Sequence, residues 1–145
     1  MLINGCFLYP EQYLFIWKVA FLSLFSSIYA INNGHYDLAL VPGGVFLTSI
    51  NYWRKPVPDS WRRYIDITYV GLALTYQSIR AYNAQYSIEH YATVMIAMSF
   101  YPLGTYFYNK KQYWNATYSH SMIHIMANIS NIILYSGDIK NTFYR

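Results

Sequence analysis

A compact bundle of membrane-spanning α-helices is the fold that this sequence predicts. Of its 145 residues, 55% are hydrophobic and 11% are charged, whereas soluble domains carry about 25% charged residues. The apolar residues form runs close to the roughly 20 residues that a bilayer core requires. Short polar loops separate these runs, and many Trp and Tyr residues lie near their ends, as in the aromatic belts of membrane proteins. We therefore expect one all-α transmembrane domain over residues 1–145.

Five spanning helices account for the apolar runs. In the first, Lys18 lies about one turn inside the span and can reach the headgroups with its ammonium. In the second, Pro42 and the two glycines after it predict a kink or close helix packing. Pro102 and Gly104 predict a bend late in the fourth, and Gly137 is a plausible C-terminal cap for the fifth. The expected helices cover about residues 13–31, 36–53, 64–82, 90–108 and 114–136.

The basic residues predict the orientation of this bundle. The loop after the second helix carries Arg54, Lys55, Arg62 and Arg63, and the loop after the fourth carries Lys110 and Lys111. The other side of the membrane receives only Arg80, Lys140 and Arg145. Because Lys and Arg accumulate in cytoplasmic loops, we expect a cytoplasmic N-terminus and an exterior or lumenal C-terminus. We interpret these cations as determinants of membrane orientation, in preference to contacts with nucleic acid.

Polar residues converge in one layer on the predicted cytoplasmic side. His120 and His124 lie one turn apart in the fifth helix, a spacing that suits a transition metal. Ser49 and Trp53 end the second helix, and Asp66 opens the third at the same depth. His35 and His90 belong to the opposite surface. A polar stripe continues along the fifth helix and should face the bundle interior, since lipid does not solvate it; it comprises Thr117, His120, His124, Asn128, Asn131 and Tyr135.

These motifs resemble the superfamily of seven-helix membrane hydrolases that joins alkaline ceramidases, adiponectin and progestin receptors, and haemolysin III proteins. In that family a Ser-x-x-x-His ends the second helix, an Asp opens the third and a His-x-x-x-His lies in the last. Here Ser49 to Trp53 resembles the first motif, Asp66 the second, and His120 with His124 the third. The resemblance implies a zinc site with three His ligands and a water, which hydrolyses a lipid amide or ester.

The chain departs from that family in two respects. It has room for five helices instead of seven, and Trp53 occupies the place of the first ligand histidine. An indole N–H donates a hydrogen bond and does not ligate a metal. If a metal binds, His120, His124 and Asp66 are the expected ligands, for zinc or ferrous iron, with Ser49 orienting water or substrate.

Two interpretations of this degenerate site stay open. In one, the chain is a metal-dependent lipid hydrolase that uses Ser49 and Asp66 beside the histidine ligands. In the other, the chain is a non-catalytic membrane scaffold, lipid binder or partner subunit, and the polar residues join helices to one another. Asp66 would then pair with Arg62 or Arg63 at the interface. Membrane lipids are the expected partners in both cases, and nucleic acid is not.

Overall fold

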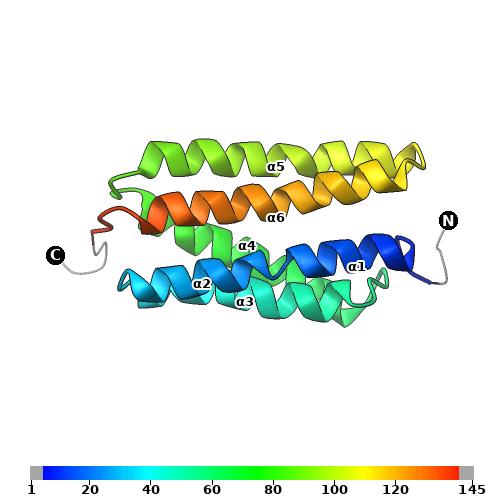
Figure 1. Ribbon diagram of the computed structural model, residues 1–145, viewed down its shortest axis with the longest axis horizontal. Coiled ribbons are helices and arrows are strands. Elements are labelled where there is room, and N and C mark those ends of the chain that lie inside the picture. The colour runs from blue at the N-terminus through cyan, green and yellow to red at the C-terminus, as the bar shows by residue number, and fades with distance from the viewer. Residues whose placement is uncertain (1–4, 141–145) are drawn as a thin grey trace.

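The chain folds into an elongated bundle of α-helices (Figure 1), and the computed structural model describes residues 5–140. No strand forms within this range, where one isolated antiparallel bridge joins Ala84 to Ile139. The all-helical expectation is therefore confirmed. The helices are α1 (Pro10–Val19), α2 (Leu22–Asn32), α3 (Tyr36–Trp53), α4 (Trp61–Ala81), α5 (Ser87–Asn109) and α6 (Tyr113–Tyr135).

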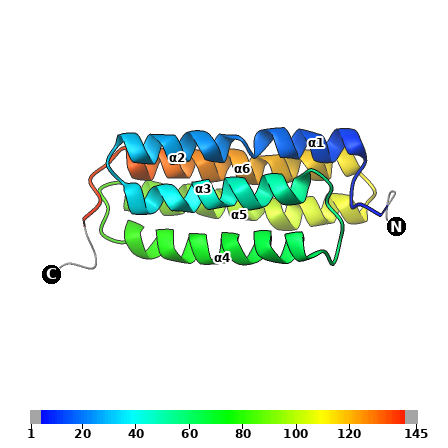
Figure 2. The ribbon, with the colours of Figure 1, turned by 90° about the horizontal axis from the view of Figure 1, so that it is seen from below.

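The first expected helix is divided into α1 and α2, which follow one another along the same side of the bundle (Figure 2). At the junction, the carbonyl oxygen of Ala20 accepts from the Ser23 N–H at 3.1 Å, and that of Phe21 accepts from the Leu24 N–H at 3.0 Å. These i to i+3 bonds belong to a tighter 3₁₀ turn, which interrupts the α-helix without reversing the chain. The fold thus has five rods, which match the five expected helices.

Helix α6 packs against the first rod, made of α1 and α2, and against α5. This helix contacts α1 and α2 on one side and makes the most extensive contact of the bundle with α5 on another. The remaining large contacts place α3 between α2 and α4, and α4 forms the outer rod in Figure 2. Although α4 and α5 are joined by a short loop, they barely touch. Successive rods run in opposite directions, so α1 begins at one end of the bundle and α6 finishes at the other (Figure 1).

Glycines allow the closest approaches between rods. Helix α3 is not interrupted at Pro42. The two glycines that follow it lie where α3 packs closely against its neighbours. A Cβ on Gly44 would collide with the ring of Tyr69 on α4, whose hydroxyl donates to the carbonyl oxygen of Leu40 at 2.6 Å. On α5, a Cβ at Gly104 would lie 3.4 Å from the Cβ of Ser119 on α6. Small residues therefore set the helix spacing, as in membrane bundles.

The interior of the bundle is rich in polar side chains, and its outer surface is rich in large apolar ones. Apolar residues share the interior, in one cluster that includes Leu38 and Leu134 and another that includes Ile16 and Trp53. Among the described residues, the helical segment Pro10–Asn32, which joins α1 and α2, is long and apolar enough by itself to cross a membrane. The buried polar residues are Gln12, Ser23, Ser26, Ser49, Asp66, Gln77, Arg80, His90, Thr117, Ser119, Ser121, His124, Asn128, Ser130 and Asn131.

Candidate functional site

The predicted layer of polar residues lies near the end of the bundle that carries the basic loops. We call this the basic end; its loops, 54–60 and 110–112, join α3 to α4 and α5 to α6. Within the layer, Asp66 is 8% exposed and is the first buried residue of α4. Its Oδ1 atom accepts from Thr48 Oγ1 at 2.7 Å and from Ser49 Oγ at 2.9 Å. The structure therefore brings Ser49 and Asp66 together.

The hydroxyl groups, and not a guanidinium, are the hydrogen-bond partners of Asp66. Arg62 instead donates to the backbone oxygens of Asn51 at 3.3 Å and Lys55 at 3.2 Å, near the C-terminal end of α3. The guanidinium of Arg63 lies 5.1 Å from the ring centroid of Phe7. The expected pairing of Asp66 with one of these arginines is therefore wrong. Both arginines are engaged at the surface, while the carboxylate points into the bundle.

His120 and His124 lie beside each other on α6, with ring centroids 5.3 Å apart. The indole of Trp53, on α3, packs against His120 with a centroid separation of 4.5 Å and an interplanar angle of 51°. Trp53 is 8% exposed, so its ring occupies interior space. Neither imidazole makes a hydrogen bond to another of the described residues. Position 53 thus lies next to the histidine pair, where the resemblance places the first ligand.

The residues present do not fit a zinc site. Within residues 5–140, no three His, Cys, Asp or Glu side chains are grouped so that they could hold a metal ion. The expected set of His120, His124 and Asp66 is thus not assembled: Asp66 bonds to hydroxyls of α3, and the indole of Trp53 fills the space beside His120. Two imidazoles and an indole offer fewer ligands than the three that a catalytic zinc site takes from the protein.

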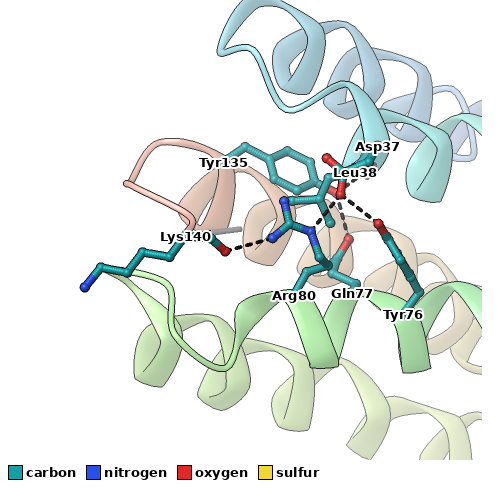
Figure 3. A network of polar contacts seen from close by, with 7 residues as sticks. All are labelled: Asp37, Leu38, Tyr76, Gln77, Arg80, Tyr135 and Lys140. Carbon is teal, nitrogen blue, oxygen red and sulfur yellow. Dashed lines mark hydrogen bonds and ion pairs between the residues drawn. The ribbon is translucent and has the colours of Figure 1, made fainter. Parts of the chain in front are cut away.

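A second polar cluster, which the sequence pattern did not predict, lies at the opposite end of the bundle, and Figure 3 shows its contacts. Arg80 Nε donates to Asp37 Oδ2 at 2.7 Å, the one ion pair among the described residues. The Tyr76 hydroxyl donates to the same oxygen at 2.7 Å. Arg80 Nη1 also donates to the backbone oxygen of Lys140 at 2.9 Å. We call these residues the Asp37–Arg80 cluster; it joins α3, α4 and the segment after α6.

The cluster extends into the interior through Gln77. The hydroxyl of Tyr135 donates to Gln77 Oε1 at 2.7 Å, and Gln77 Nε2 donates to Asn131 Oδ1 at 2.7 Å. Tyr135 is fully buried, and Figure 3 shows its hydroxyl directed at the group around Asp37 and Arg80. Since α4 and α6 share few backbone contacts, these side-chain hydrogen bonds form a principal connection between them.

Asn128 connects α6 to α2 at a third level, between the two ends. Its Oδ1 accepts from Ser26 Oγ at 2.6 Å, and its Nδ2 donates to Ser23 Oγ at 3.2 Å and to the His124 carbonyl oxygen at 2.7 Å. The predicted stripe on α6 is confirmed as an inward face, apart from the half-buried His120. Its side chains bond mainly to other helices, as polar residues commonly do in membrane bundles.

His90 is buried, although its position in the sequence predicted a place at the membrane surface. It is fully enclosed between α5 and α6, and its Nδ1 lies 2.6 Å from Ser130 Oγ. The Ser130 hydroxyl also lies 3.0 Å from the His90 carbonyl oxygen. The expected depth along the bundle is kept, but the side chain points inward because α5 turns this face towards α6.

The chain matches no protein-family model, and no curated protein or solved structure matches it. The class of molecule therefore rests on the fold and the site: an all-α bundle with a polar interior and three levels of interhelical hydrogen bonding.

Proposed function

We propose that this chain is a multi-pass membrane protein, crossing the bilayer five times, whose role is non-catalytic: a scaffold or partner subunit that contacts membrane lipids. The observation that carries the proposal is the set of large apolar side chains exposed on the outer surface, around an interior that contains many polar residues. A polar interior and an apolar exterior are expected of a bundle whose surroundings are lipid, because every interior polar group then needs a protein partner.

The outward-facing side chains support this placement. Far from the helix ends, large apolar residues stand exposed, such as Leu47 (63%), Leu72 (67%) and Met95 (70%). Monomeric soluble proteins rarely expose contiguous apolar surface on this scale. Exposed Trp and Tyr residues lie near helix ends, where a membrane interface would meet them; they include Trp61, Tyr64 and Trp114 at the basic end and Tyr36 and Tyr82 at the other.

Helix length supports the same placement. The unbroken helices α3, α4, α5 and α6 have 18, 21, 23 and 23 residues. At about 1.5 Å per residue they are close to the ~30 Å of a hydrocarbon core. The mean hydropathy of these four helices is lower than that of Pro10–Asn32, because they contain the inward-facing polar residues and many of the 18 Tyr residues. Tyr lowers the mean hydropathy although its ring is largely apolar.

Charge supports a cytoplasmic placement of the basic end. Six cations lie in or beside its two loops. Among the described residues, the other end has Arg80 and Lys140, and Arg145 lies outside the described residues. Arg80 is moreover buried in an ion pair and does not contribute a free charge to its loop. By the positive-inside rule, the start of α1 faces the cytoplasm and the end of α6 faces the exterior or a lumen.

A non-catalytic role is favoured by how the interior side chains are used. Asp66, the predicted catalytic carboxylate, is held by two hydroxyls, and Trp53 lies against His120 in the place of a ligand. We propose that the chain is a diverged, shortened relative of the ceramidase and progestin-receptor-like hydrolases that keeps the bundle without the metal centre. The proximity of position 53 to the histidine pair supports this relationship.

Fractionation and metal analysis test the two parts of the proposal separately. The expressed chain should remain in the membrane pellet after alkaline carbonate extraction and dissolve only in detergent; release by carbonate would contradict membrane integration. The detergent-purified protein should contain far less than one zinc or iron per chain. Near-stoichiometric metal that is lost in His120→Ala would instead support the hydrolase interpretation and overturn the non-catalytic role.

A further inference from the structure

The segment before α1 lies against the basic end of the bundle. Its Cys6 and Leu8 side chains are 4% and 5% exposed, and Phe7 between them is half-buried. The Phe7 backbone N–H donates to the Pro56 carbonyl oxygen at 3.2 Å, which joins the segment to the loop between α3 and α4. We call residues 5–8 the strap.

The strap connects two helices that otherwise barely touch. The Phe7 ring contacts the guanidinium of Arg63 on α4, at 5.1 Å from the ring centroid, and the ring of Tyr108 on α5, with centroids 6.1 Å apart. Helices α4 and α5 themselves share few backbone contacts. At the opposite end, the Tyr91 hydroxyl on α5 donates to the Ser78 carbonyl oxygen on α4 at 2.6 Å. The two outer helices are therefore joined at both ends, and Phe7 makes the connection at the basic end.

The strap also adjoins the predicted layer of polar residues. Phe7 packs against a buried apolar cluster that comprises Leu8, Ile16, Tyr52 and Trp53. Trp53 in turn packs against His120, with ring centroids 4.5 Å apart. The apolar cluster to which the strap contributes Leu8 thus extends, through Trp53, to the histidine pair.

Helix α1 does not need the strap in order to begin. Pro10 is its first residue, where a fixed φ suits the helix. The Tyr9 backbone N–H donates to Gln12 Oε1 at 3.1 Å, and the Tyr9 carbonyl oxygen accepts from the N–H groups of Gln12 and Tyr13 at 3.0 and 3.1 Å. These bonds remain when residues 5–8 move away. Moreover, the one ion pair among the described residues lies at the other end of the bundle, so none holds the strap.

We propose that the strap is a lid: residues 5–8 leave the basic end while the helices stay folded, which separates α4 from α5 there and lets the aqueous phase reach Trp53 and the histidine pair. Segments with few buried contacts open at a lower free-energy cost than the whole domain. The opening rests on the contacts of the strap alone. That the aqueous phase is the cytoplasm rests on the proposed membrane placement.

The reaction of Cys6 with a maleimide tests the opening, because Cys6 is buried in the strap and is the single cysteine of the chain. In the detergent-purified protein, Cys6 should react about 10- to 100-fold more slowly than in the denatured chain. Global unfolding alone gives protection of roughly 10³–10⁸. Circular dichroism should show intact helices throughout. Protection equal to the global unfolding constant, measured by denaturant titration, would overturn the lid, as would an absence of protection.

Matched variants test the contacts. Phe7→Ala removes the contacts with Arg63 and Tyr108 and should speed the labelling of Cys6 about tenfold. Arg63→Met removes only the cation–π contact and should speed it about two- to fivefold. Lys55→Met changes an exposed side chain beside Pro56 and should leave the rate unchanged. Equal acceleration in Lys55→Met, or none in Phe7→Ala, would overturn the proposed role of these contacts.

A cysteine in place of His124, which is 8% exposed, tests whether the opening reaches the histidine pair. In a Cys6→Ser background, His124→Cys should label several-fold faster when Phe7→Ala is added, and an unchanged rate would overturn the lid over this pair. In sealed membranes, an impermeant maleimide should reach Cys6 of the wild type only from the cytoplasmic side. Labelling from the other side would contradict the proposed orientation, whereas the measurements in detergent decide the lid itself, so the two failures are distinguishable.

Discussion

The two ends of the bundle hold an aspartate in different ways, and Asp66 is buried whereas the Asp37 side chain is 41% exposed. At the opposite end, Asp37 shares its Oδ2 between a guanidinium and a phenol, and Arg80 continues to the backbone of Lys140. At the basic end, Asp66 has two hydroxyl donors and no cation. One carboxylate therefore takes part in a charge-balanced tie between three segments, and the other joins only α3 and α4.

The same contrast appears in the neighbouring rings. Tyr135 is fully buried next to the Asp37–Arg80 cluster, and its hydroxyl is bonded to Gln77. His120 and His124, near the basic end, pack against each other and Trp53 without a hydrogen bond to another described residue. The polar groups near Asp37 are therefore more fully hydrogen-bonded than the two imidazoles near the basic end.

The largest effect is expected from Arg80→Met. This change removes the ion pair with Asp37 and the bond to the Lys140 backbone, leaving a carboxylate without its cation. Breaking a buried pair by removing one partner costs about 3–5 kcal/mol, and the 41% exposure of the Asp37 side chain reduces this to about 2–3 kcal/mol. The unfolding midpoint in detergent should fall by many degrees.

Lys140→Met is the matched control for that experiment. It removes the same formal charge from the same end but keeps the backbone oxygen that Arg80 uses. Figure 3 shows the Lys140 side chain extending away from the cluster. The control should unfold close to the wild-type temperature, and an equal loss in both variants would mean that net charge, and not the tie between segments, stabilises this end.

An intermediate effect is expected from Trp53→His at the basic end. Replacing a buried indole with an imidazole leaves a partial cavity, and we expect a loss of about 2 kcal/mol without metal. The new imidazole lies next to His120 and His124, so it can complete the set of three histidines that zinc favours. Zinc should therefore bind this variant, measured by calorimetry, and raise its unfolding midpoint.

The double variant Trp53→His, His124→Ala is the control for zinc binding, because it restores a two-imidazole arrangement. Zinc should not stabilise it. If Trp53→His gains no affinity for zinc over the wild type, the basic end does not preserve the geometry of a hydrolase metal centre, and the proposed relationship to that superfamily fails.

The smallest effect is expected from Asp66→Asn. The amide oxygen can still accept from Thr48 and Ser49, and no cation loses a partner. The change in stability should stay below about 1 kcal/mol, the usual net value of a neutral hydrogen bond. A destabilisation as large as that of Arg80→Met would show that the charge of Asp66 is required, contrary to the comparison between the two ends.

Much of the fold was predictable because helical segments separated by short polar loops indicate helix number and approximate bounds. The inward stripe on α6 was also predictable, since its polar residues recur at helical spacing. The junction between α1 and α2 was not, because Ala20 and Phe21 are ordinary helix residues and the tighter turn there depends on packing.

The site was predicted at the right depth but in the wrong grouping. Depth along the bundle follows from sequence position, which is why Ser49 reaches Asp66 and Trp53 reaches His120. The direction in which each side chain points depends on rotation of its helix, and successive residues differ by about 100°. Asp66 consequently turns to Thr48 and Ser49 on α3 and is not grouped with the histidines.

The Asp37–Arg80 cluster had a signal in the sequence that was not used. Asp37 and Arg80 are opposite charges within two predicted spans, at depths that place them at the same end. Ionisable residues inside membrane spans usually pair with one another, so the pair could have been proposed from topology alone.

Cysteine labelling in sealed membranes tests most directly whether the apolar outer surface faces lipid. In a Cys6→Ser background, single cysteines at Leu47 and Leu72, exposed at 63% and 67%, should resist a membrane-impermeant maleimide until the protein is denatured in detergent. Lys55→Cys should react only from the cytoplasmic side, and Asn83→Cys only from the other. Ready labelling at Leu47→Cys and Leu72→Cys in intact membranes would show that this surface faces water and would contradict the account.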